Sequence, residues 1–336
     1  MENHPYFNTR FITASEERFG KLYGETVNWL IGGDIPSYAK KIKVESFDIK
    51  NFKKNNIKIV FSALPPDVAL KIEKELAYKG YYVFSNSRAY RYNGNVPILI
   101  PEVNPEHINI IKNQLKTQKG FIITNANCST TGLVLALRPL LKFGISKIIV
   151  STYQALSGAG YPGVPSIEIN GNVIPYIPDE EEKIKIETNK ILGRFTDNKI
   201  ISNNLPVFAN CVRVPVRDGH LESVVIEFEK EIDINSIKKS FRNLSSIKDL
   251  PTSPIKPIIL REEENRPQPI LDVNAGQPER AKGMSITIGR IKKQEKQVRF
   301  FLLVHNTIRG AAGNSVLNAE YALKSNFLLK GGNNKK

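Results

Sequence analysis

The chain has 336 residues, of which 41% are hydrophobic and 24% are charged. The length predicts about two domains, and the composition excludes a disordered protein. Two cysteines exclude a disulfide scaffold and a cysteine-rich metal site, and they indicate a reducing compartment. No apolar run is long enough to span a membrane, and the N-terminus has no signal-peptide pattern. We therefore expect a cytoplasmic protein that binds no metal.

Lys and Arg exceed Asp and Glu by 48 − 33 = 15 charges. Such an excess is compatible with nucleic acid, a membrane surface or an anionic small molecule as partner. The basic residues are spread along the chain, and no stretch interleaves them with aromatic residues as in a single-strand binder. We therefore favour a solvated basic surface and expect neither nucleic acid nor a membrane as partner.

Strands and helices alternate in the first half of the chain. The predicted strands are 10–13, 57–62, 81–84 and 121–124. Apolar residues at helical spacing predict helices at 67–79 and 107–115. This alternation predicts an α/β, Rossmann-type doubly wound sheet with helices on both faces.

Longer, alternating strands dominate the second half, where helices are predicted at 180–192 and 235–243. The predicted strands are 147–151, 212–216, 223–230, 285–290 and 297–304. This pattern predicts an α+β domain with a largely antiparallel sheet, half of it exposed to a partner. An Ala-rich last helix near 313–325 could return to the first domain. We therefore expect a dinucleotide-binding domain at 1–127 and 311–330, and a catalytic and oligomerisation domain at 128–310.

Residues 157–163, Ser-Gly-Ala-Gly-Tyr-Pro-Gly, match the pattern G-x-G-x-x-G literally. A dinucleotide fingerprint also needs a helix that begins at the motif, because the helix N-terminus holds the pyrophosphate. Pro162 and Pro165 argue against such a helix, and we expect 167–169 to be extended. The motif is better interpreted as a glycine-rich loop whose backbone approaches another group closely.

Cys128 falls where a predicted strand meets a predicted helix, and it is the candidate nucleophile. Free N–H groups and the helix dipole at such a junction favour the reactive thiolate. Asn127 could donate to a developing oxyanion. The alternative is a small buried side chain near a helix cap, and local sequence does not decide between the two. For Cys211, in the middle of an apolar strand, we favour the structural interpretation.

A thiolate nucleophile needs an acid–base partner, and the chain has four histidines. His220 ends a strand at a glycine turn, from which its side chain can project into a cleft. His4 and His107 look superficial, and His305 looks like a structural residue. Arg213, seven residues before His220, could bind a substrate carboxylate through two guanidinium nitrogens.

Ordered motifs along nearly the whole chain resemble one family. They are Phe61-Ser62-Ala63-Leu64-Pro65, Phe84-Ser85-Asn86, Ala89-Tyr90-Arg91, Ile100-Pro101-Glu102-Val103-Asn104, Asn127-Cys128-Ser129-Thr130, Gln154 to Tyr161, Glu187 to Gly193, Arg213 to His220, Gly283-Met284-Ser285, Gly289-Arg290 and Asn306 to Gly313. The chain thus resembles the aspartate-β-semialdehyde dehydrogenases of the branch found in archaea and fungi.

The resemblance implies NADP-dependent reductive dephosphorylation of L-4-aspartyl phosphate to L-aspartate 4-semialdehyde, on the route to lysine, threonine, methionine and isoleucine. It implies that Cys128 attacks the acyl carbon and forms a thioester, that His220 shuttles a proton and that Gln154 orients the substrate. It also implies a homodimer or a homotetramer.

The resemblance further assigns the substrate-binding residues. Arg213 and Glu187 would hold the carboxylate and the ammonium group of the substrate, while Arg91, Lys190 and Asn127 would hold its phosphate or inorganic phosphate. Judged without the family, Glu187 and Lys190 would be a surface pair three residues apart on a helix, and Arg91 a solvated loop residue.

Cofactor contacts are implied in both halves of the chain. The implied residues are Ser15, Ser62, Ala63, Leu64, Pro65, Ser85, Asn86, Ser157, Gly158 and Asn314. Ser15 suits the 2′-phosphate of NADP, but Glu17 occupies the place where relatives commonly have a basic residue, and Arg18 comes one position later. A carboxylate there could take a ribose hydroxyl, so NAD is possible as well as NADP.

The family's first strand and its G-x-x-G-x-x-G turn have no counterpart in this sequence. In a sheet of order 3-2-1-4-5-6 that strand is central. Its loss would leave its neighbours about 10 Å apart, with unpaired backbone groups between them, and would remove the helix N-terminus for the pyrophosphate. We weigh a misplaced start codon, with Met1 internal to a longer protein, against a truncated chain, and favour the former.

Two other functions compete with this interpretation. A related acyl-CoA reductase, such as malonyl-CoA reductase, shares the thioester chemistry and differs in the acyl pocket. A non-catalytic basic binding protein would account for the charge and for the absence of the glycine-rich turn.

Overall fold

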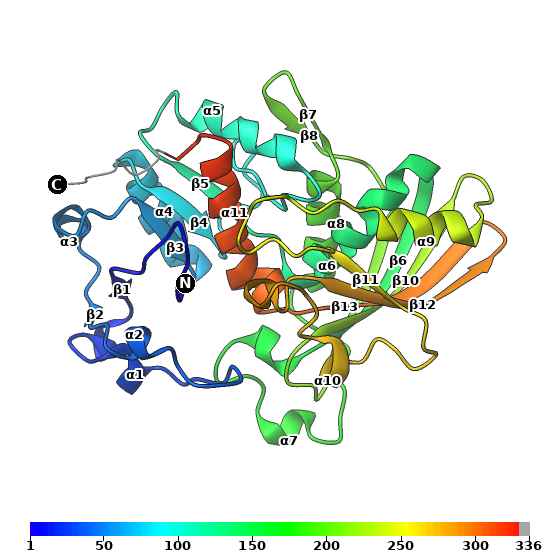
Figure 1. Ribbon diagram of the computed structural model, residues 1–336, viewed down its shortest axis with the longest axis horizontal. Coiled ribbons are helices and arrows are strands. Elements are labelled where there is room, and N and C mark those ends of the chain that lie inside the picture. The colour runs from blue at the N-terminus through cyan, green and yellow to red at the C-terminus, as the bar shows by residue number, and fades with distance from the viewer. Residues whose placement is uncertain (329–336) are drawn as a thin grey trace.

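A computed structural model describes residues 1–328 of the chain (Figure 1). The first half contains a parallel sheet of three strands, β3 (Ile59–Ser62), β4 (Tyr82–Ser85) and β5 (Phe121–Thr124). Helix α4 (Pro66–Tyr78) covers one face, where its Leu76 packs in one cluster with Val83. Helix α11 (Gly313–Lys324) covers the other, where Ala322 packs in one cluster with Phe84. The predicted return of the last helix to this sheet is confirmed.

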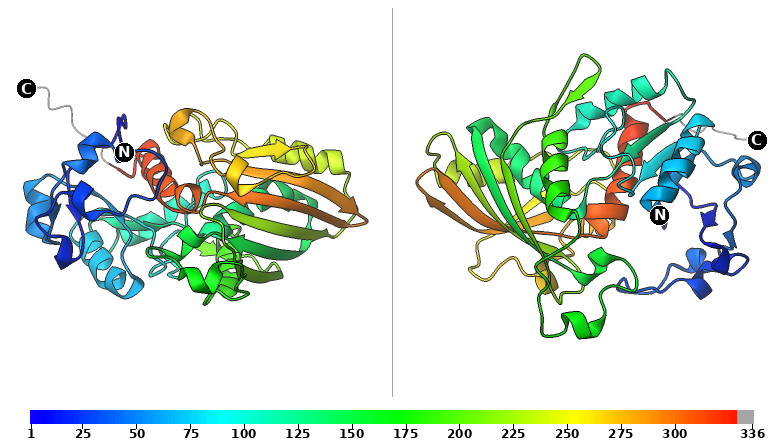
Figure 2. Two further views of the ribbon diagram at one scale, coloured as in Figure 1. Left: turned by 90° about the horizontal axis from the view of Figure 1, so that it is seen from below. Right: turned by 180° about the vertical axis from the view of Figure 1, so that it is seen from behind.

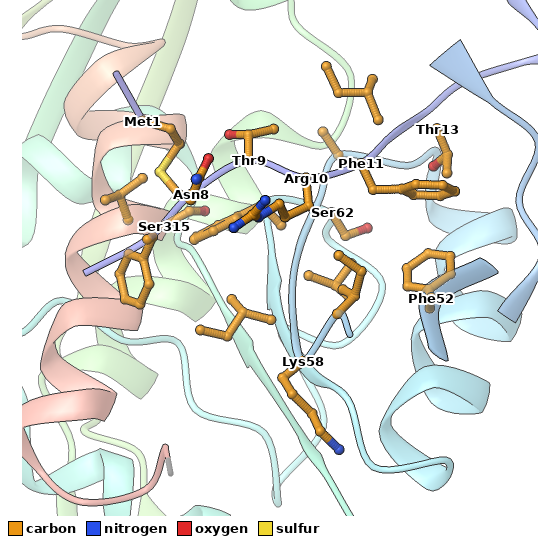
Figure 3. A pocket seen from close by; sticks show the side chains of 18 of the residues that line it. Met1, Asn8, Thr9, Arg10, Phe11, Thr13, Phe52, Lys58, Ser62 and Ser315 are labelled. Carbon is orange, nitrogen blue, oxygen red and sulfur yellow. The ribbon is translucent and has the colours of Figure 1, made fainter. Parts of the chain in front are cut away.

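The expected interruption of this sheet is also present. Strands β1 (Ile12–Thr13) and β2 (Val44–Glu45) pair with each other in parallel but not with β3. Between β1 and β3 lies a cavity of about 640 Å³, lined on one side by residues 8–13 and on the other by residues 57–63 (Figure 3). The strand order is therefore β2-β1, a gap, and then β3-β4-β5, which is the doubly wound order without its central strand.

Short helices make up the rest of this part. They are η1 (Glu16–Arg18), α1 (Tyr23–Thr26), α2 (Ser37–Lys40), α3 (Ile49–Lys54), η2 (Pro105–Ile110) and α5 (Ile111–Gln114). Figure 2 shows α1 and α2 standing away from the three-stranded sheet, on the far side of the β1–β2 pair.

The second half contains a six-stranded sheet in the order β11-β12-β13-β10-β6-β9. These strands are β6 (Ile145–Gln154), β9 (Val207–Arg213), β10 (His220–Phe228), β11 (Ile258–Arg261), β12 (Ile286–Gln294) and β13 (Gln297–Val304). The four central strands are antiparallel, and each edge strand pairs in parallel with its neighbour. The predicted largely antiparallel sheet is confirmed.

One face of this sheet is buried beneath helices. The helices of this half are α6 (Cys128–Leu137), η3 (Arg138–Phe143), η4 (Leu156–Ala159), α7 (Ser166–Ile169), α8 (Glu180–Ile191), α9 (Ile234–Arg242), α10 (Pro269–Asp272), η5 (Glu279–Ala281) and the π-helix η6 (Ile308–Ala312). Residues of α6, α8 and α9 join inward-facing strand residues in one large core cluster. The opposite face leaves Ile149, Tyr153 and Phe208 between 38% and 56% exposed. A small hairpin, β7 (Arg194–Thr196) and β8 (Lys199–Ile201), follows α8.

Four expectations are compared with the structure here. No helix begins at Gly158 or Gly160, so the glycine motif is a loop that contains only the 3-10 turn η4. Residues 167–169 belong to helix α7 and are not extended, which corrects the expectation. His4 and His107 are not superficial, because the side chain of each is at most 1% exposed. The expected first domain ends at residue 330, and its last two residues lie outside the described part.

Candidate active site

Cys128 is the first residue of helix α6, directly after the buried strand β5 and its short turn. Asn127 caps this helix, since its Oδ1 accepts the main-chain N–H groups of Ser129 at 3.0 Å and Thr130 at 3.2 Å. On the other side lies Gly310 of the π-helix η6, where an added Cβ would come within 2.6 Å of the Cβ of Cys128. The predicted strand-to-helix junction is confirmed, and a glycine lets a second segment approach it.

His220 lies against this cysteine, with its Nε2 at 3.1 Å from the Sγ of Cys128. Its Nδ1 accepts the main-chain N–H of Ala155 at 3.0 Å. A neutral imidazole carries one proton, so that proton is on Nε2, which faces the sulfur as a donor. Of the four histidines, the sequence therefore selected the one that contacts the candidate nucleophile.

Burial governs the protonation of this pair. Desolvation, followed by the negative charge of Glu180, raises the pKa of Cys128 to about 12, against the opposing effects of Arg91 and Arg213. Desolvation, followed by the positive charge of Arg213, lowers the pKa of His220 to about 3. Both groups are neutral at pH 7. The expectation that the helix N-terminus yields a resting thiolate is therefore wrong for this state of the site, because burial outweighs the dipole.

The sheet brings two more predicted residues to the same place. Gln154 is the last residue of β6 and pairs with Arg213 of β9. On its other side β6 pairs with β10, and because Tyr153 faces Leu221 there, the antiparallel register places Gln154 beside His220. The three side chains therefore form one row on the buried face. The guanidinium of Arg213 is tied to this row through Nη1, which donates to the carbonyl of Ala155 at 2.7 Å.

Glu187, Arg91 and Lys190 are all buried, so they are neither a surface pair nor a solvated loop residue. Glu187 accepts Arg91 Nη1 at 2.9 Å through one oxygen and the main-chain N–H of Asn127 at 2.5 Å through the other. Lys190 Nζ donates to the carbonyls of Arg91, Asn93 and Val96 at 2.6–2.8 Å. Desolvation lowers the pKa of Lys190 to about 8. In this structure Glu187 and Lys190 hold Arg91 and its loop in place.

Two further features were not found from the sequence. Glu180, the first residue of α8, accepts hydrogen bonds from Asn127 Nδ2 and Gln154 Nε2. Arg309, in the π-helix beside Cys128, forms a two-pronged ion pair with Glu102, and both side chains are completely buried. Glu180 stands in a run of acidic residues, and Glu102 and Arg309 are separated by 207 residues, so no local pattern marks either feature.

The cavity between β1 and β3 contains part of the predicted cofactor set. Ser62, Ala63 and Asn86 line it, together with Ala312 and Ser315 from the segment that follows Gly310. The Ser62 hydroxyl is buried and has no hydrogen-bond partner among the described residues. A volume of this size suits a small-molecule or cofactor site. Because Gly310 touches Cys128, the segment 310–315 connects the cavity to the candidate nucleophile.

The other predicted cofactor residues lie outside the lining of this cavity. Ser85 is engaged with Glu73 and Ser157 with Asn306, whereas Ser15 is exposed. Leu64 and Pro65 lead into α4. Gly158 lies against His220, and Asn314 is buried with its Oδ1 unpaired. Directly after β1 the chain forms the 3-10 turn η1, and the first α-helix, α1, begins only at Tyr23 and has four residues. The residues present therefore fit part of a dinucleotide.

No cluster of three or more metal-ligating side chains occurs in residues 1–328. None of the helices in this part is both long and apolar enough to cross a membrane.

Comparison with known proteins agrees with this geometry. Two family models match, "Semialdehyde dehydrogenase, NAD binding domain" over residues 1–111 and "Semialdehyde dehydrogenase, dimerisation domain" over residues 137–309. The chain belongs to the semialdehyde dehydrogenase family. Cys128 lies between the two matched segments, where β5 leads into α6.

Individual relatives of the family cover nearly the whole chain. An aspartate-semialdehyde dehydrogenase of Archaeoglobus fulgidus is 48% identical over 98% of this chain and 94% of its own length. A malonyl-CoA reductase (NADP) of Metallosphaera sedula is 35% identical over 98% of this chain and 93% of its own. The crystal structure of the Candida albicans aspartate semialdehyde dehydrogenase with NADP superposes with a TM-score of 0.85, at 33% identity over 97% of this chain and 94% of that one.

Proposed function

We propose that this chain is an aspartate-semialdehyde dehydrogenase that catalyses the NADP-dependent reductive dephosphorylation of L-4-aspartyl phosphate. The observation that carries the proposal is the contact of Cys128 Sγ with His220 Nε2 at the start of α6, with Arg91 and Arg213 near enough to act on the cysteine's pKa. Two buried guanidinium groups beside a nucleophile suit a substrate with a carboxylate and an acyl phosphate.

In the proposed mechanism the Sγ of Cys128 forms a bond to the acyl carbon as the bond from that carbon to the phosphate oxygen breaks. Inorganic phosphate leaves with the thiol proton, and a thioester remains. His220 donates its Nε2–H to the sulfur, which stabilises the negative charge that develops on the sulfur as the thiol proton leaves and again when the sulfur is released from the product, after which the sulfur regains a proton from solvent. When bound, NADPH supplies the hydride that brings the acyl carbon to the aldehyde level. The positive charges of Arg91 and Arg213 stabilise the negative charge on the sulfur and on the phosphate.

The substrate contacts are proposals of the same kind. Arg213 would bind the carboxylate, and Arg91 and Asn127 the phosphate. For Glu187 and Lys190 to take the ammonium and the phosphate, the substrate must displace contacts that each now makes within the protein. The alternative within the proposal is that both act indirectly, by holding Arg91.

The test is phosphate-dependent reduction of NADP⁺ with L-aspartate 4-semialdehyde, followed by NADPH absorbance. Cys128→Ser is expected to abolish the reaction, whereas Cys211→Ala, at the other buried cysteine, is expected to retain it. A chain that reduces malonyl-CoA and shows no reaction with the semialdehyde would be a malonyl-CoA reductase, and the proposal would be wrong. The ratio of kcat/KM for NADPH and NADH tests the choice of cofactor.

A homo-oligomer is part of the proposal, because the second half matches a dimerisation domain and its sheet leaves Ile149, Tyr153 and Phe208 exposed on one face. We propose a homodimer through this face, and sedimentation equilibrium distinguishes it from a tetramer. We also propose the cytoplasm as its location, since a reducing compartment keeps Cys128 as a free thiol.

A further inference from the structure

Glu180 is the point at which two predicted active-site amides meet. Its Oε1 accepts Asn127 Nδ2 at 2.7 Å and Gln154 Nε2 at 2.9 Å, and the residue is 6% exposed. Its other oxygen lies 3.5 Å from Lys183 Nζ. No other carboxylate among the described residues accepts from both amides.

A carboxylate can only accept hydrogen bonds, so each amide that meets it must present its NH₂ group. Gln154 gives its second N–H to Thr152 Oγ1 at 3.3 Å, which leaves only its carbonyl oxygen for a ligand. Asn127 likewise directs its NH₂ group to Glu180, so its side-chain carbonyl oxygen accepts the first main-chain N–H groups of α6. With an amide at position 180, either side chain could turn around.

We propose that Glu180 is a positioning residue that fixes the orientation of Asn127 and Gln154, so that α6 stays capped at Cys128 and Gln154 offers an acceptor to the substrate. The acceptor complements a hydrogen-bond donor. On the proposed function, on which this last step rests, the donor is the ammonium group of the amino-acid substrate, which malonyl-CoA lacks.

The test separates the hydrogen bonds of Glu180 from its charge. Glu180→Asp keeps the charge but withdraws it by about 1.5 Å, the length of one carbon–carbon bond. We expect a loss of kcat/KM of about tenfold or more, because small displacements in an active site have effects of this size. We expect faster amide exchange at Ser129 and Thr130 as the cap loosens, and little change in the pH midpoint of Cys128 alkylation by iodoacetamide.

Glu180→Gln keeps the side-chain length and removes the charge that raises the pKa of Cys128. We expect its alkylation midpoint to move to lower pH. Glu182→Gln, an exposed acid on the same helix turn, is the matched control and should leave all three measurements unchanged. Thermal melting of each variant checks that it is folded.

Wild-type kcat/KM and wild-type amide exchange in Glu180→Asp would overturn the proposal. If that variant does not fold, Glu180→Gln decides: a lower midpoint together with a gain in kcat/KM would mean that only the charge matters. Amide exchange and alkylation need no substrate. An enzyme inactive toward the semialdehyde would therefore refute the proposed function, while the positioning role would still be judged by exchange.

Discussion

Gly158, in the glycine-rich loop, leaves no room for a side chain beside His220. An added Cβ would lie 2.8 Å from His220 Cε1 and 3.0 Å from both His220 Nε2 and Arg213 Nη1. Ordinary contact begins at 3.4 Å, so Gly158→Ala must push the imidazole by about 0.6 Å, the difference of the two distances. The same ring carries Nε2, which lies 3.1 Å from the sulfur of Cys128.

We expect Gly158→Ala to lower kcat/KM by about 10- to 100-fold, or about 1.4–2.7 kcal/mol in activation free energy. The loop is exposed and this glycine does not have a positive φ, so the melting temperature should hardly change. The assay is phosphate-dependent NADPH formation, with Gly32→Ala as control, because a Cβ there meets nothing within 4 Å. Activity within twofold of the wild type would refute the inference that His220 needs this glycine.

Two predictions concern stability. Arg309→Met leaves the Glu102 carboxylate buried without its partner, and we expect a loss of about 3–5 kcal/mol in the free energy of unfolding, measured with urea; a loss below 1 kcal/mol would contradict it. Burial, and then the charge of Glu180, raises the pKa of Glu222 well above 4.5. The folded state therefore holds a proton that the unfolded state has lost, and stability should fall above pH 4.5 by about 1.4 kcal/mol per pH unit, until the folded pKa is reached. Glu222→Gln should remove this loss, so its advantage in melting temperature should grow from pH 5 to pH 8; a constant difference would contradict the assignment.

The fold was predictable where local patterns are strong. The apolar runs at 59–62, 82–85 and 121–124 form the three-stranded sheet, and the alternation along 220–228 gives a strand buried on every second residue. The short helix α7 was missed, because one turn flanked by prolines has no helical periodicity. His107 was misjudged for a different reason. Its partners are the carbonyl of Gly193, 86 residues away, and the side chain of Asn104, and long-range satisfaction of a polar group leaves no local trace.

In the candidate site, too, local features could be predicted and effects of long-range packing could not. Position and residue type identified Cys128 and His220, because a strand-to-helix junction and a glycine turn beside a strand are local features. His220 begins β10 after Gly219, which corrects the expectation that it ends a strand. Protonation was not predictable from position. The helix N-terminus lowers a thiol pKa, but burial and the carboxylate of Glu180 act in the opposite sense and dominate here.

The residues that set this balance come from the start of α8, which the sequence describes only as an acidic helix. Glu180 and Glu187 lie on its buried side, while Glu182 between them is exposed. Seven residues are about two turns, so the helical repeat places the two buried acids on one side. The repeat does not say that this side faces Asn127, because that follows only from the contact of α8 with α6. A positioning carboxylate of this kind becomes visible only when the packing of the two helices is known.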